Sequence, residues 1–280
     1  MQLIENFSFQ GVSGAYSEQA GKNFFPKAKS LPCPTFEEMF EQVRNGKVDA
    51  AMVPIENSLA GRVADTQRLI PNSDLKITAE YFLDVNHCLL GIKGSKISDI
   101  KRIHSHEQGI AQCRKKIIKL EKEMIVEADT AGSAKLVSEL NNINDAAIAS
   151  ELAAKIYNLD IIQNNFQDVQ HNVTRFLIMQ KEMLQLDNSL DNLITTLVFN
   201  VRSIPAALYK CLGGFASNGV NITKLESYVH SQGFDVAQFY IDFEGHPENP
   251  SVKLALEEMK FFSKELKILG VYAKSNFRKK

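Results

Sequence analysis

The pattern that most restricts the fold of this chain is the alternation of short apolar runs with amphipathic segments through its first two thirds. The capping box at 35–38 opens one such segment, and Gly46 ends it. The apolar run that follows, at 50–53, reads as a buried strand stopped by Pro54. Other strand–helix pairs are predicted at 7–10 and from about 17, at 102–104 and 107–120, at 124–126 and 130–140, and at 146–148 and 151–157. Repeated units of this kind predict an α/β fold with a largely parallel sheet and helices on its faces.

The pattern changes after a polar stretch at 182–193, which we interpret as a linker. The predicted elements beyond it are a strand at 195–201, a helix at 205–217 with Pro205 in its first turn, strands at 222–229 and 234–243, a helix at 250–263 and a strand at 267–272. The order β-α-β-β-α-β is that of a split ferredoxin-like unit, so a small α+β domain is expected here. The basic end, 277–280, is interpreted as a solvated tail.

Charge and cysteine content exclude several classes of protein. The 280 residues carry 32 Lys and Arg against 33 Asp and Glu, a net charge of −1, so no nucleic acid or anionic membrane partner is expected. The start of the chain lacks a signal-peptide pattern, and no apolar run reaches the roughly 18 residues that cross a bilayer. Cys33, Cys88, Cys113 and Cys211 form no C-x-x-C pair and are expected to be free thiols, buried or half-buried. We therefore predict a cytoplasmic protein.

The search for cofactor motifs is negative. The sequence contains no G-x-G-x-x-G, no phosphate-binding G-x-x-x-x-G-K-[ST] and no G-x-S-x-G elbow. His104 and His106 share a strand face, but spacing supplies no third metal ligand, and His87 and Cys88 point to opposite faces. A site for a small molecule, without metal or organic cofactor, is expected.

Polar residues follow several predicted strands, where ligands bind in open α/β sheets. These are Gly11–Ser17, Ile55–Ser58 with Gly61, and Asp129–Ala131. Each offers amide and hydroxyl donors for an anion, and each also fits an ordinary loop or capped turn, with Asp129 as an N-cap. The run 172–176 is more specific, because its hydroxyl, guanidinium and ring suit an anionic ring compound. An exposed Arg at a strand entrance is the alternative.

Taken together, these motifs resemble prephenate dehydratase. The resemblance rests on Gly11-Val12-Ser13-Gly14-Ala15-Tyr16-Ser17, Val53-Pro54-Ile55-Glu56-Asn57-Ser58-Leu59-Ala60-Gly61, His104-Ser105-His106 with Gln108 and Gln112-Cys113, Asp129-Thr130-Ala131, and Asn172-Val173-Thr174-Arg175-Phe176. Their order covers residues 6–180, and 194–273 is similar to the regulatory ACT domain appended to that enzyme. The resemblance implies a catalytic domain at 1–183, made of two lobes similar to periplasmic binding proteins with substrate between them, and an ACT domain at 194–273.

The activity implied by the resemblance is the conversion of prephenate to phenylpyruvate, water and carbon dioxide in phenylalanine biosynthesis, without a cofactor. Thr174 is the implied catalytic residue, hydrogen-bonded to the departing hydroxyl, with a relayed proton as an alternative. Arg175 either pairs with a substrate carboxylate or braces the cleft, and Phe176 forms an apolar wall. The implied substrate-binding set is Ser17, Asn57, Ser58, Gly61, Thr130, Ala131, Asn172, Arg175 and Phe176.

The ACT domain implies feedback by L-phenylalanine and a homodimer or homotetramer joined through these domains. The expected effector residues are Ala206, Ala207, Leu208, Asn218, Asn221, Ile222, Leu225, Glu226 and Ser227. This chain has Ala206 where the family usually has Gly, and Tyr228-Val229 where it usually has Arg-Pro, which weakens the expectation of feedback. Two alternatives stay open: arogenate dehydratase, which takes the aminated substrate, and a non-catalytic amino-acid or solute binder. The absence of a chorismate-mutase-like segment before residue 6 argues against a bifunctional enzyme.

Overall fold

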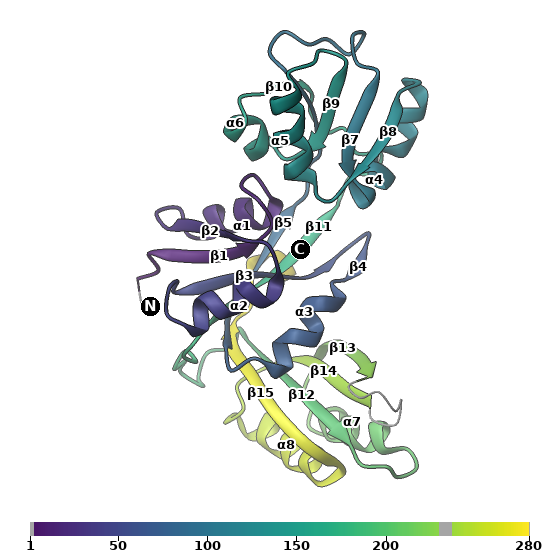
Figure 1. Ribbon diagram of the computed structural model, residues 1–280. Coiled ribbons are helices and arrows are strands. Elements are labelled where there is room, and N and C mark those ends of the chain that lie inside the picture. Colours follow the sequence, from purple (N-terminus) through teal and green to yellow (C-terminus); the bar gives the residue numbers. More distant parts are fainter. Residues whose placement is uncertain (1–2, 230–236, 280) are drawn as a thin grey trace. The chain divides into compact units, whose positions relative to one another are not determined.

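The computed structural model describes residues 3–229 and 237–279. The chain forms two compact units: unit 1 is Met1–Thr66 with Tyr81–Phe176, and unit 2 is Gln67–Glu80 with Leu177–Lys280. Two strands, β5 (Lys76–Asp84) and β11 (Val173–Gln180), run from one unit into the other (Figure 1). Each unit is described by itself below.

The first lobe of unit 1 is a sheet with one helix on each face. Its strands are β1 (Asn6–Gln10), β2 (Lys29–Cys33), β3 (Ala50–Asn57) and part of β11, in the order β11-β3-β1-β2, and β1 is parallel to both β2 and β3. Its helices are α1 (Tyr16–Phe24) and α2 (Phe36–Arg44). Phe7 faces α1, where a Cβ on Gly21 would lie 2.0 Å from the Phe7 ring. Ser8 faces α2 and donates to the Met39 carbonyl at 2.9 Å.

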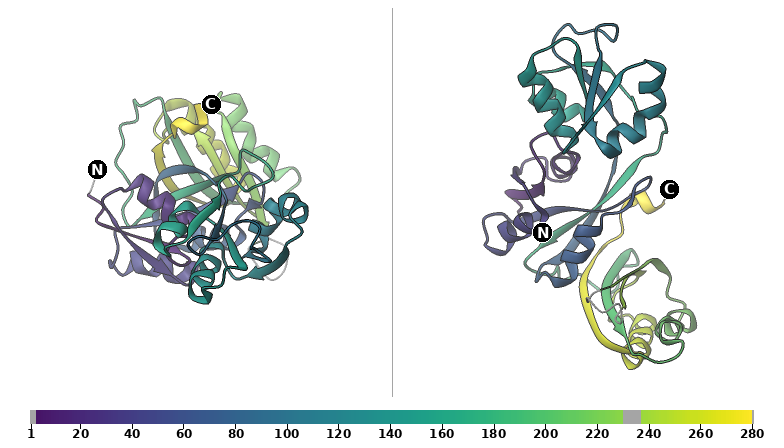
Figure 2. Two further views of the ribbon diagram at one scale, coloured as in Figure 1. Left: turned by 90° about the horizontal axis from the view of Figure 1, so that it is seen from above. Right: turned by 45° about the vertical axis from the view of Figure 1, so that its right-hand side comes forward.

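The second lobe of unit 1 has a five-stranded sheet in the order β10-β6-β9-β7-β8. Its elements are β6 (Cys88–Gly91), β7 (Arg102–His106), α4 (Glu107–Lys119), β8 (Glu123–Glu127), α5 (Thr130–Leu140), β9 (Asp145–Ala149), α6 (Glu151–Ile156) and β10 (Asp160–Gln163). Strands β7, β8 and β9 are parallel, whereas β6 and β10 pair antiparallel. Alternate residues of the sheet pack against α4 on one face and against α5 and α6 on the other. Figure 2 shows helices on both faces of this sheet.

Unit 2 contains the predicted β-α-β-β-α-β domain (Figure 1). Its elements are β12 (Leu193–Val201), α7 (Ala207–Ser217), β13 (Ile222–Val229), β14 (Ala237–Glu244), α8 (Pro250–Phe262) and β15 (Ser263–Ala273). The order β13-β14-β12-β15 is antiparallel throughout. Both helices pack on one face, around Phe199, Phe215, Phe243 and Met259. The predicted fold class, two α/β lobes with a ferredoxin-like α+β domain, is confirmed.

The segment Gln67–Glu80 belongs to unit 2 because it is attached to β15 and to the end of the chain. It holds the end of α3 (Ala64–Leu69), the turn η1 (Ile70–Asn72) and the start of β5. Gly270 of β15 pairs with Ile77 of β5 so closely that a Cβ on Gly270 would lie 2.1 Å from the Ile77 carbonyl oxygen. The Lys267 ammonium donates to the carbonyls of Pro71 and Ser73 at 2.8 and 2.9 Å.

The prediction that 277–280 is a solvated tail is wrong for Arg278. The turn η2 (Asn276–Lys279) brings the Arg278 guanidinium onto Glu80, with N–O distances of 2.7 and 2.9 Å. The Glu80 side chain is fully buried, and that of Arg278 is only 16% exposed. A buried carboxylate needs a paired cation, which is why this basic residue leaves the solvent.

Two predicted element boundaries at prolines are also wrong, the end of a strand at Pro54 and the start of a helix at Pro205. Strand β3 continues through Pro54 to Asn57, because the register of β3 with β1 ends at Ala51 and Pro54 therefore breaks no hydrogen bond of that ladder. Helix α7 begins at Ala207 rather than Pro205, because Ala206 takes a left-handed conformation at φ +58°. The first residues of the strand predicted at 234–243 lie outside the described residues, and β14 is described from Ala237. Among the described residues, no helix is long and apolar enough to cross a membrane.

Candidate functional site

Unit 1 contains a pocket of about 200 Å³ between loop, helix and strand ends. Its lining consists of uncharged polar side chains, two histidines and a few apolar side chains. The lining residues are Tyr16, Ser17, Pro54, Asn57, Val63, Val85, His87, His106, Gln108, Gly109, Gln112, Thr130, Asn172, Thr174 and Phe176. Of the residues predicted from the sequence, the structure brings six together here: Ser17, Asn57, Thr130, Asn172, Thr174 and Phe176.

Three helices begin at this pocket. Tyr16 and Ser17 open α1, Gln108 and Gly109 lie in the first turn of α4, and Thr130 opens α5. The first amides of a helix lack partners within the helix, and its dipole favours a negative charge at this end. The pocket is therefore suited to an anion even though its described lining contains no Lys or Arg.

Four predicted binding residues lie outside the lining of this pocket, namely Ser58, Gly61, Ala131 and Arg175. Ser58 ties the end of β3 to β11, since its hydroxyl donates to the His171 carbonyl at 3.1 Å and accepts the Val173 amide at 2.9 Å. Gly61 lies opposite Asn57 in the short hairpin made by β3 and β4 (Gly61–Arg62). Ala131 is fully buried in α5. Their substrate contacts stay predictions.

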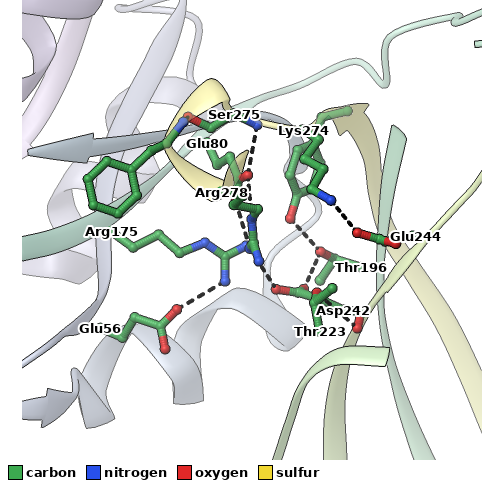
Figure 3. A network of polar contacts seen from close by, with 12 residues as sticks. Glu56, Glu80, Arg175, Thr196, Thr223, Asp242, Glu244, Lys274, Ser275 and Arg278 are labelled. Atoms are coloured by element: carbon green, nitrogen blue, oxygen red, sulfur yellow. Dashed lines mark hydrogen bonds and ion pairs between the residues drawn. The ribbon is translucent and has the colours of Figure 1, made fainter. Parts of the chain in front are cut away.

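Arg175 points away from the pocket because it follows Thr174 on the same strand. Its side chain is 2% exposed, and its Nη1 lies 3.1 Å from Glu56 Oε1 (Figure 3). The guanidinium also lies over the Phe82 ring, 6.0 Å from the centroid. Of the two roles left open for Arg175, this contact favours bracing of the site through β3 and β11 over direct pairing with substrate.

A directed set of hydrogen bonds orients the Thr174 hydroxyl. The backbone amides of Leu59 and Ala60 donate to Asn57 Oδ1 at 3.0 and 2.8 Å. Because these amides fix which end of the side chain is oxygen, the Asn57 amide nitrogen must face the other way. It donates to Asn172 Oδ1 at 2.7 Å and to Thr174 Oγ1 at 2.9 Å. Thr174 therefore accepts from Asn57, and its own proton is free to be donated into the pocket.

The sequence did not assign roles to Tyr16, His87, His106, Gln108 or Gln112, although all five line the pocket. One signal was available for two of them, since Gln108 and Gln112 are four apart on α4 and so share a helix face. His106 caps α4 by accepting the Gln108 amide at 3.3 Å. His87, which directly precedes β6, has no comparable signal, because its partners come from distant segments.

Burial controls the protonation of the two largest polar rings in the pocket. Burial lowers the pKa of His87 below its ordinary value, an effect opposed in part by its hydrogen bond to Gln112. Burial also raises the pKa of the Tyr16 phenol well above its ordinary value. At neutral pH both rings are therefore uncharged. No carboxylate, lysine or arginine occurs among the described residues of the lining.

A separate cluster of charges supports the second lobe. Arg102 donates two hydrogen bonds to Asp145 at 2.6 and 2.8 Å. The His104 ring lies between Glu127 and Asp145, at 3.0 and 3.1 Å. The pKa of Asp145 is lowered chiefly by its hydrogen bonds with Arg102, and also by its hydrogen bond with His104 and by the charges of both residues. Burial has the opposite effect. The fold thus brings two carboxylates next to His104, which the spacing of residues in the sequence did not indicate. Even so, no group of three or more potential metal ligands occurs within 3–229 and 237–279, and a cofactor-free site stays a prediction.

The residues expected to bind an effector fall at the two ends of α7 and on β13. Ala206 and Ala207 precede and open α7, while Leu208 and Ile222 pack against the core of unit 2. Asn218 donates to the Gly214 carbonyl at 2.8 Å, and the Asn221 carbonyl accepts the Glu244 amide at 2.9 Å. On β13, Leu225 is 40% exposed, Glu226 pairs with Lys224 at 3.1 Å, and Ser227 is exposed. Their role in effector binding stays a prediction.

The fold and the site together define a class of protein. Unit 1 is a two-lobed α/β structure whose pocket is lined by helix N-termini, amide side chains and one oriented hydroxyl. Unit 2 adds a ferredoxin-like domain. Folds of this class occur both in enzymes and in proteins that only bind small molecules.

Comparison with known proteins specifies the family. The family model described as Prephenate dehydratase matches residues 7–184. A relative from Komagataeibacter europaeus, named bifunctional N-acyl-homoserine lactone acylase/prephenate dehydratase, is 46% identical over 273 residues, which cover 98% of this chain and 97% of the relative. Arogenate dehydratase/prephenate dehydratase 2 of Arabidopsis thaliana is 39% identical over 95% of this chain and 72% of its own length.

A solved structure supports the same family assignment from the three-dimensional fold. The structure of prephenate dehydratase from Arthrobacter aurescens in complex with L-Phe has a TM-score of 0.87 and 32% identity, covering 96% of this chain and 90% of that one. This chain belongs to the prephenate dehydratase family. It is an enzyme of aromatic amino-acid biosynthesis, a carbon–oxygen lyase of the dehydratase type, as its motifs predicted.

Proposed function

We propose that this chain dehydrates and decarboxylates prephenate in preference to arogenate. The observation that carries the proposal is the neutral, donor-rich lining of the pocket. Prephenate presents two carboxylates, a keto group and a ring hydroxyl, all of which accept hydrogen bonds. Arogenate has an ammonium group in place of the keto oxygen, and a buried ammonium requires a carboxylate partner. The described lining contains none, so it favours prephenate.

The overall reaction requires one proton and no redox change. The ring carboxylate leaves as carbon dioxide, its bonding electrons move into the ring, and the ring hydroxyl leaves at the opposite carbon. Prephenate dianion and one proton thus give phenylpyruvate anion, carbon dioxide and water. Formation of the aromatic ring supplies the driving force, so the enzyme has to position the substrate and assist departure of the hydroxyl.

Thr174 is the residue in this pocket whose position supports that assistance. Its oxygen accepts from Asn57 at 2.9 Å, so its proton is not used in that contact and is available for donation to a ligand. The hydroxyl stabilises the departing oxygen by a hydrogen bond, and the proton consumed comes from water or from a neighbouring group. The N-termini of α1, α4 and α5 hold the carboxylates, and Phe176 forms an apolar wall beside the ring.

The substrate preference is tested by a product assay with each substrate supplied separately. Phenylpyruvate is measured from prephenate, and L-phenylalanine from arogenate. We expect kcat/KM for prephenate to exceed that for arogenate by at least about tenfold, the effect of an unpartnered buried polar group. A preference for arogenate would overturn the assignment of substrate, and no turnover of either would overturn the proposed function.

The same series of assays also tests for the acylase activity that the name of the Komagataeibacter relative contains, with an N-acyl-homoserine lactone as substrate. Amide hydrolysis needs an activated nucleophile. The four cysteines are buried, and burial raises the pKa of each thiol, to about 11 for Cys33 and about 12 for Cys113. These thiols are therefore poor nucleophiles, and acylase activity is not part of the proposal.

L-phenylalanine is the proposed effector of unit 2. The proposal is supported by the solved relative from Arthrobacter aurescens, which is described in complex with L-Phe. Ala206 stands where the family usually has Gly, and its φ of +58° is one that Gly adopts without strain. The substitution thus adds backbone strain at the start of α7 as well as a methyl group beside the expected effector site.

Feedback is tested by titrating the full chain with L-phenylalanine in a calorimeter while prephenate turnover is followed in parallel. Binding and inhibition at or below millimolar concentration are expected, with L-alanine as the control ligand. Absence of both heat and inhibition would remove the sensor role without affecting the catalytic proposal.

Three further features belong to the proposal. The functional domains are 1–183 and 194–273, the chain assembles as a homodimer or homotetramer through its ACT domains, and it works in the cytoplasm. Light scattering of the purified chain tests the assembly, with a monomer as the contradicting result.

A further inference from the structure

The direction of the hydrogen bonds in the pocket can be followed beyond Asn172. Because the Asn57 amide nitrogen faces Asn172 Oδ1, the Asn172 nitrogen faces the other way and donates to Gln112 Oε1 at 2.7 Å. The Gln112 oxygen is thereby placed toward β11, and its amide nitrogen is turned away from Asn172. Backbone amides at one end of the series thus determine the orientation of a side chain on α4.

The same Gln112 oxygen also contacts the imidazole of His87. The distance from His87 Nε2 to Gln112 Oε1 is 2.7 Å, and two acceptors cannot bond to each other, so Nε2 carries a proton. Gln112 Oε1 then receives two donors, one from β11 and one from His87. The amide group of Gln112 has a single orientation that satisfies both.

Tyr16 holds the other side of the His87 ring. Its hydroxyl lies 2.8 Å from His87 Nδ1 and 3.1 Å from the Asn86 carbonyl oxygen. The two rings meet edge to face, with centroids 5.5 Å apart. In the neutral imidazole Nδ1 is an acceptor, so the single Tyr16 proton is shared between Nδ1 and the Asn86 carbonyl oxygen, with Nδ1 the nearer acceptor. The His87 backbone amide is fixed as well, by Gln167 Oε1 at 3.0 Å.

We propose that His87 is a positioning residue for the proposed dehydration: held by Tyr16, it donates to Gln112 and so directs the Gln112 amide N–H group into the pocket as a substrate donor. The inference rests on the proposed function. It also specifies that His87 transfers no proton to or from substrate, because both of its ring nitrogens are engaged with protein groups.

The groups around the ring agree with a neutral imidazole. The thiols of Cys88 on β6 and Cys113 on α4 interact electrostatically with Tyr16, and burial raises the pKa of both thiols. His106 is the other titratable side chain of the described lining, and it is engaged at the cap of α4. Protonation of His87 would keep the Nε2 donor, so the positioning role does not depend on pH.

The test compares two substitutions that keep different halves of the imidazole. Glutamine can place an amide N–H near the position of Nε2, whereas asparagine reaches only the position of Nδ1. We expect His87→Asn to lower kcat/KM for prephenate about tenfold to a hundredfold. His87→Gln is expected to restore it to within about threefold of the original chain, with a pH–rate profile of unchanged shape. His246→Asn in unit 2 is the control for loss of a histidine, and thermal melting of each variant reports folding.

A double-mutant cycle separates positioning from a general structural role. If His87 acts through Gln112, then His87→Asn costs less than about twofold once Gln112 is already alanine. Tyr16→Phe provides a second route if His87→Asn does not fold. It is expected to lower kcat/KM about threefold to tenfold, again only when Gln112 is present, with the exposed Tyr209→Phe as its control.

The outcomes separate this inference from the proposed function. An active original chain together with a fully active His87→Asn variant overturns the positioning role alone. Additive losses in the cycle, or loss of one limb of the pH profile in His87→Gln, also overturn it. An original chain that turns over neither prephenate nor arogenate overturns both proposals. Non-additive losses in the cycle, together with restored activity in His87→Gln, support the positioning role of His87.

Discussion

The two units of this protein each contain a polar network, and the two networks are built in opposite ways. In the pocket of unit 1, neutral amides and a hydroxyl are linked in one direction from the backbone amides of Leu59 and Ala60 as far as Gln112, whose oxygen also contacts the imidazole of His87. In unit 2, Arg278 pairs with Glu80 and lies 3.7 Å from Asp242, whose other oxygen accepts from Thr196 at 2.6 Å (Figure 3). The first network contains no formal charge, and the second is dominated by charge.

The difference shows what each network is able to do. The network of unit 2 is deeply buried, with Asp242 and the Glu80 side chain fully covered and Thr196 also bonded to the Tyr272 hydroxyl. It attaches the end of the chain to β5 and to β14. The pocket network instead leaves donors at Thr174 and Gln112 directed outward. A closed charged network contributes stability, whereas an open neutral one presents groups to a ligand. The following substitutions test this contrast, beginning with the largest expected effect.

Thr174→Ala removes the outward hydroxyl of the pocket network. We expect turnover of prephenate to fall by about a hundredfold or more, because the departing hydroxyl loses its hydrogen-bond donor. The folded structure is expected to remain, since Thr174 accepts only one hydrogen bond from Asn57. Steady-state kinetics and thermal melting measure the two effects. Near-normal turnover would remove Thr174 from the mechanism, and Thr174→Ser is the matched variant that keeps the hydroxyl.

Arg278→Ala breaks the charged network of unit 2. It removes the Arg278 guanidinium from the buried Glu80 and Asp242 carboxylates, which is expected to lower the free energy of unfolding by about 2–4 kcal/mol. Arg278→Lys keeps the charge and loses the paired geometry, so a smaller loss is expected. The exposed pair Arg44–Glu41 is the control, because Arg44→Ala is expected to cost less than about 0.5 kcal/mol. Urea unfolding that shows no difference between the Arg278 and Arg44 variants would contradict the comparison.

Asn57→Asp reverses the direction of the pocket network with almost no change in shape. A carboxylate cannot donate, so the Thr174 hydroxyl turns to donate to residue 57 and is lost to the substrate. We expect kcat to fall about tenfold to a hundredfold while the protein stays folded. Asn188→Asp, an exposed position in the 181–192 loop, is the control for an added charge. Equal kinetics for the two variants would show that the direction of the network has no effect.

Asp145 gives the second lobe a charge-dependent stability that the neutral pocket lacks. Its hydrogen bonds from Arg102 lower its pKa in the folded state, so its contribution is present above the pKa of the unfolded chain, about 4, and is lost as the pH falls through the folded value. Asp145→Asn is expected to cost about 1–2 kcal/mol at pH 7. The difference between the two proteins should shrink below about pH 4. A difference that is constant from pH 7 to pH 3 would contradict the assignment.

Ala206→Gly tests the smallest effect, the strain at the start of α7. Since φ at this residue is +58°, glycine is expected to raise the free energy of unfolding by about 0.5–1 kcal/mol. L-phenylalanine is expected to bind more tightly to this variant, because a methyl group beside the expected effector site is removed. Chemical unfolding and calorimetric titration are the measurements. A destabilised variant would contradict the backbone argument.

Much of the fold could be predicted from local sequence, because caps and periodicities act over a few residues. Thr35 accepts the Glu38 amide at 3.1 Å and Asp129 accepts the Gly132 amide at 2.6 Å, as the motifs indicated. The elements that were predicted follow in the predicted order, but strands β2, β5 and β10 and helix α3 were not predicted. The errors fall at Pro54, Pro205 and Arg278, where the outcome depends on pairing partners and burial rather than on the local residue.

The candidate site was predicted only in part, for the same reason. Motif resemblance identified Thr174, Asn57 and Asn172, which the structure brings into contact although Asn57 and Thr174 are 117 residues apart. His87 was missed, because its partners Tyr16 and Gln112 lie 71 and 25 residues away in the chain. A contact between such distant residues leaves no periodicity or spacing by which a single sequence could reveal it.

By itself, the sequence determined the order of strands and helices, the division between an α/β part and a β-α-β-β-α-β part, and the family to which the motifs point. Only the tertiary structure decided that Arg175 turns onto Glu56, that Arg278 is buried against Glu80, and that Tyr16, His87 and Gln112 form one connected series. The physical reason is that backbone geometry is chosen locally, whereas the partner of a polar side chain is chosen by burial. Once water is excluded, each donor and acceptor must find whichever group the fold brings near.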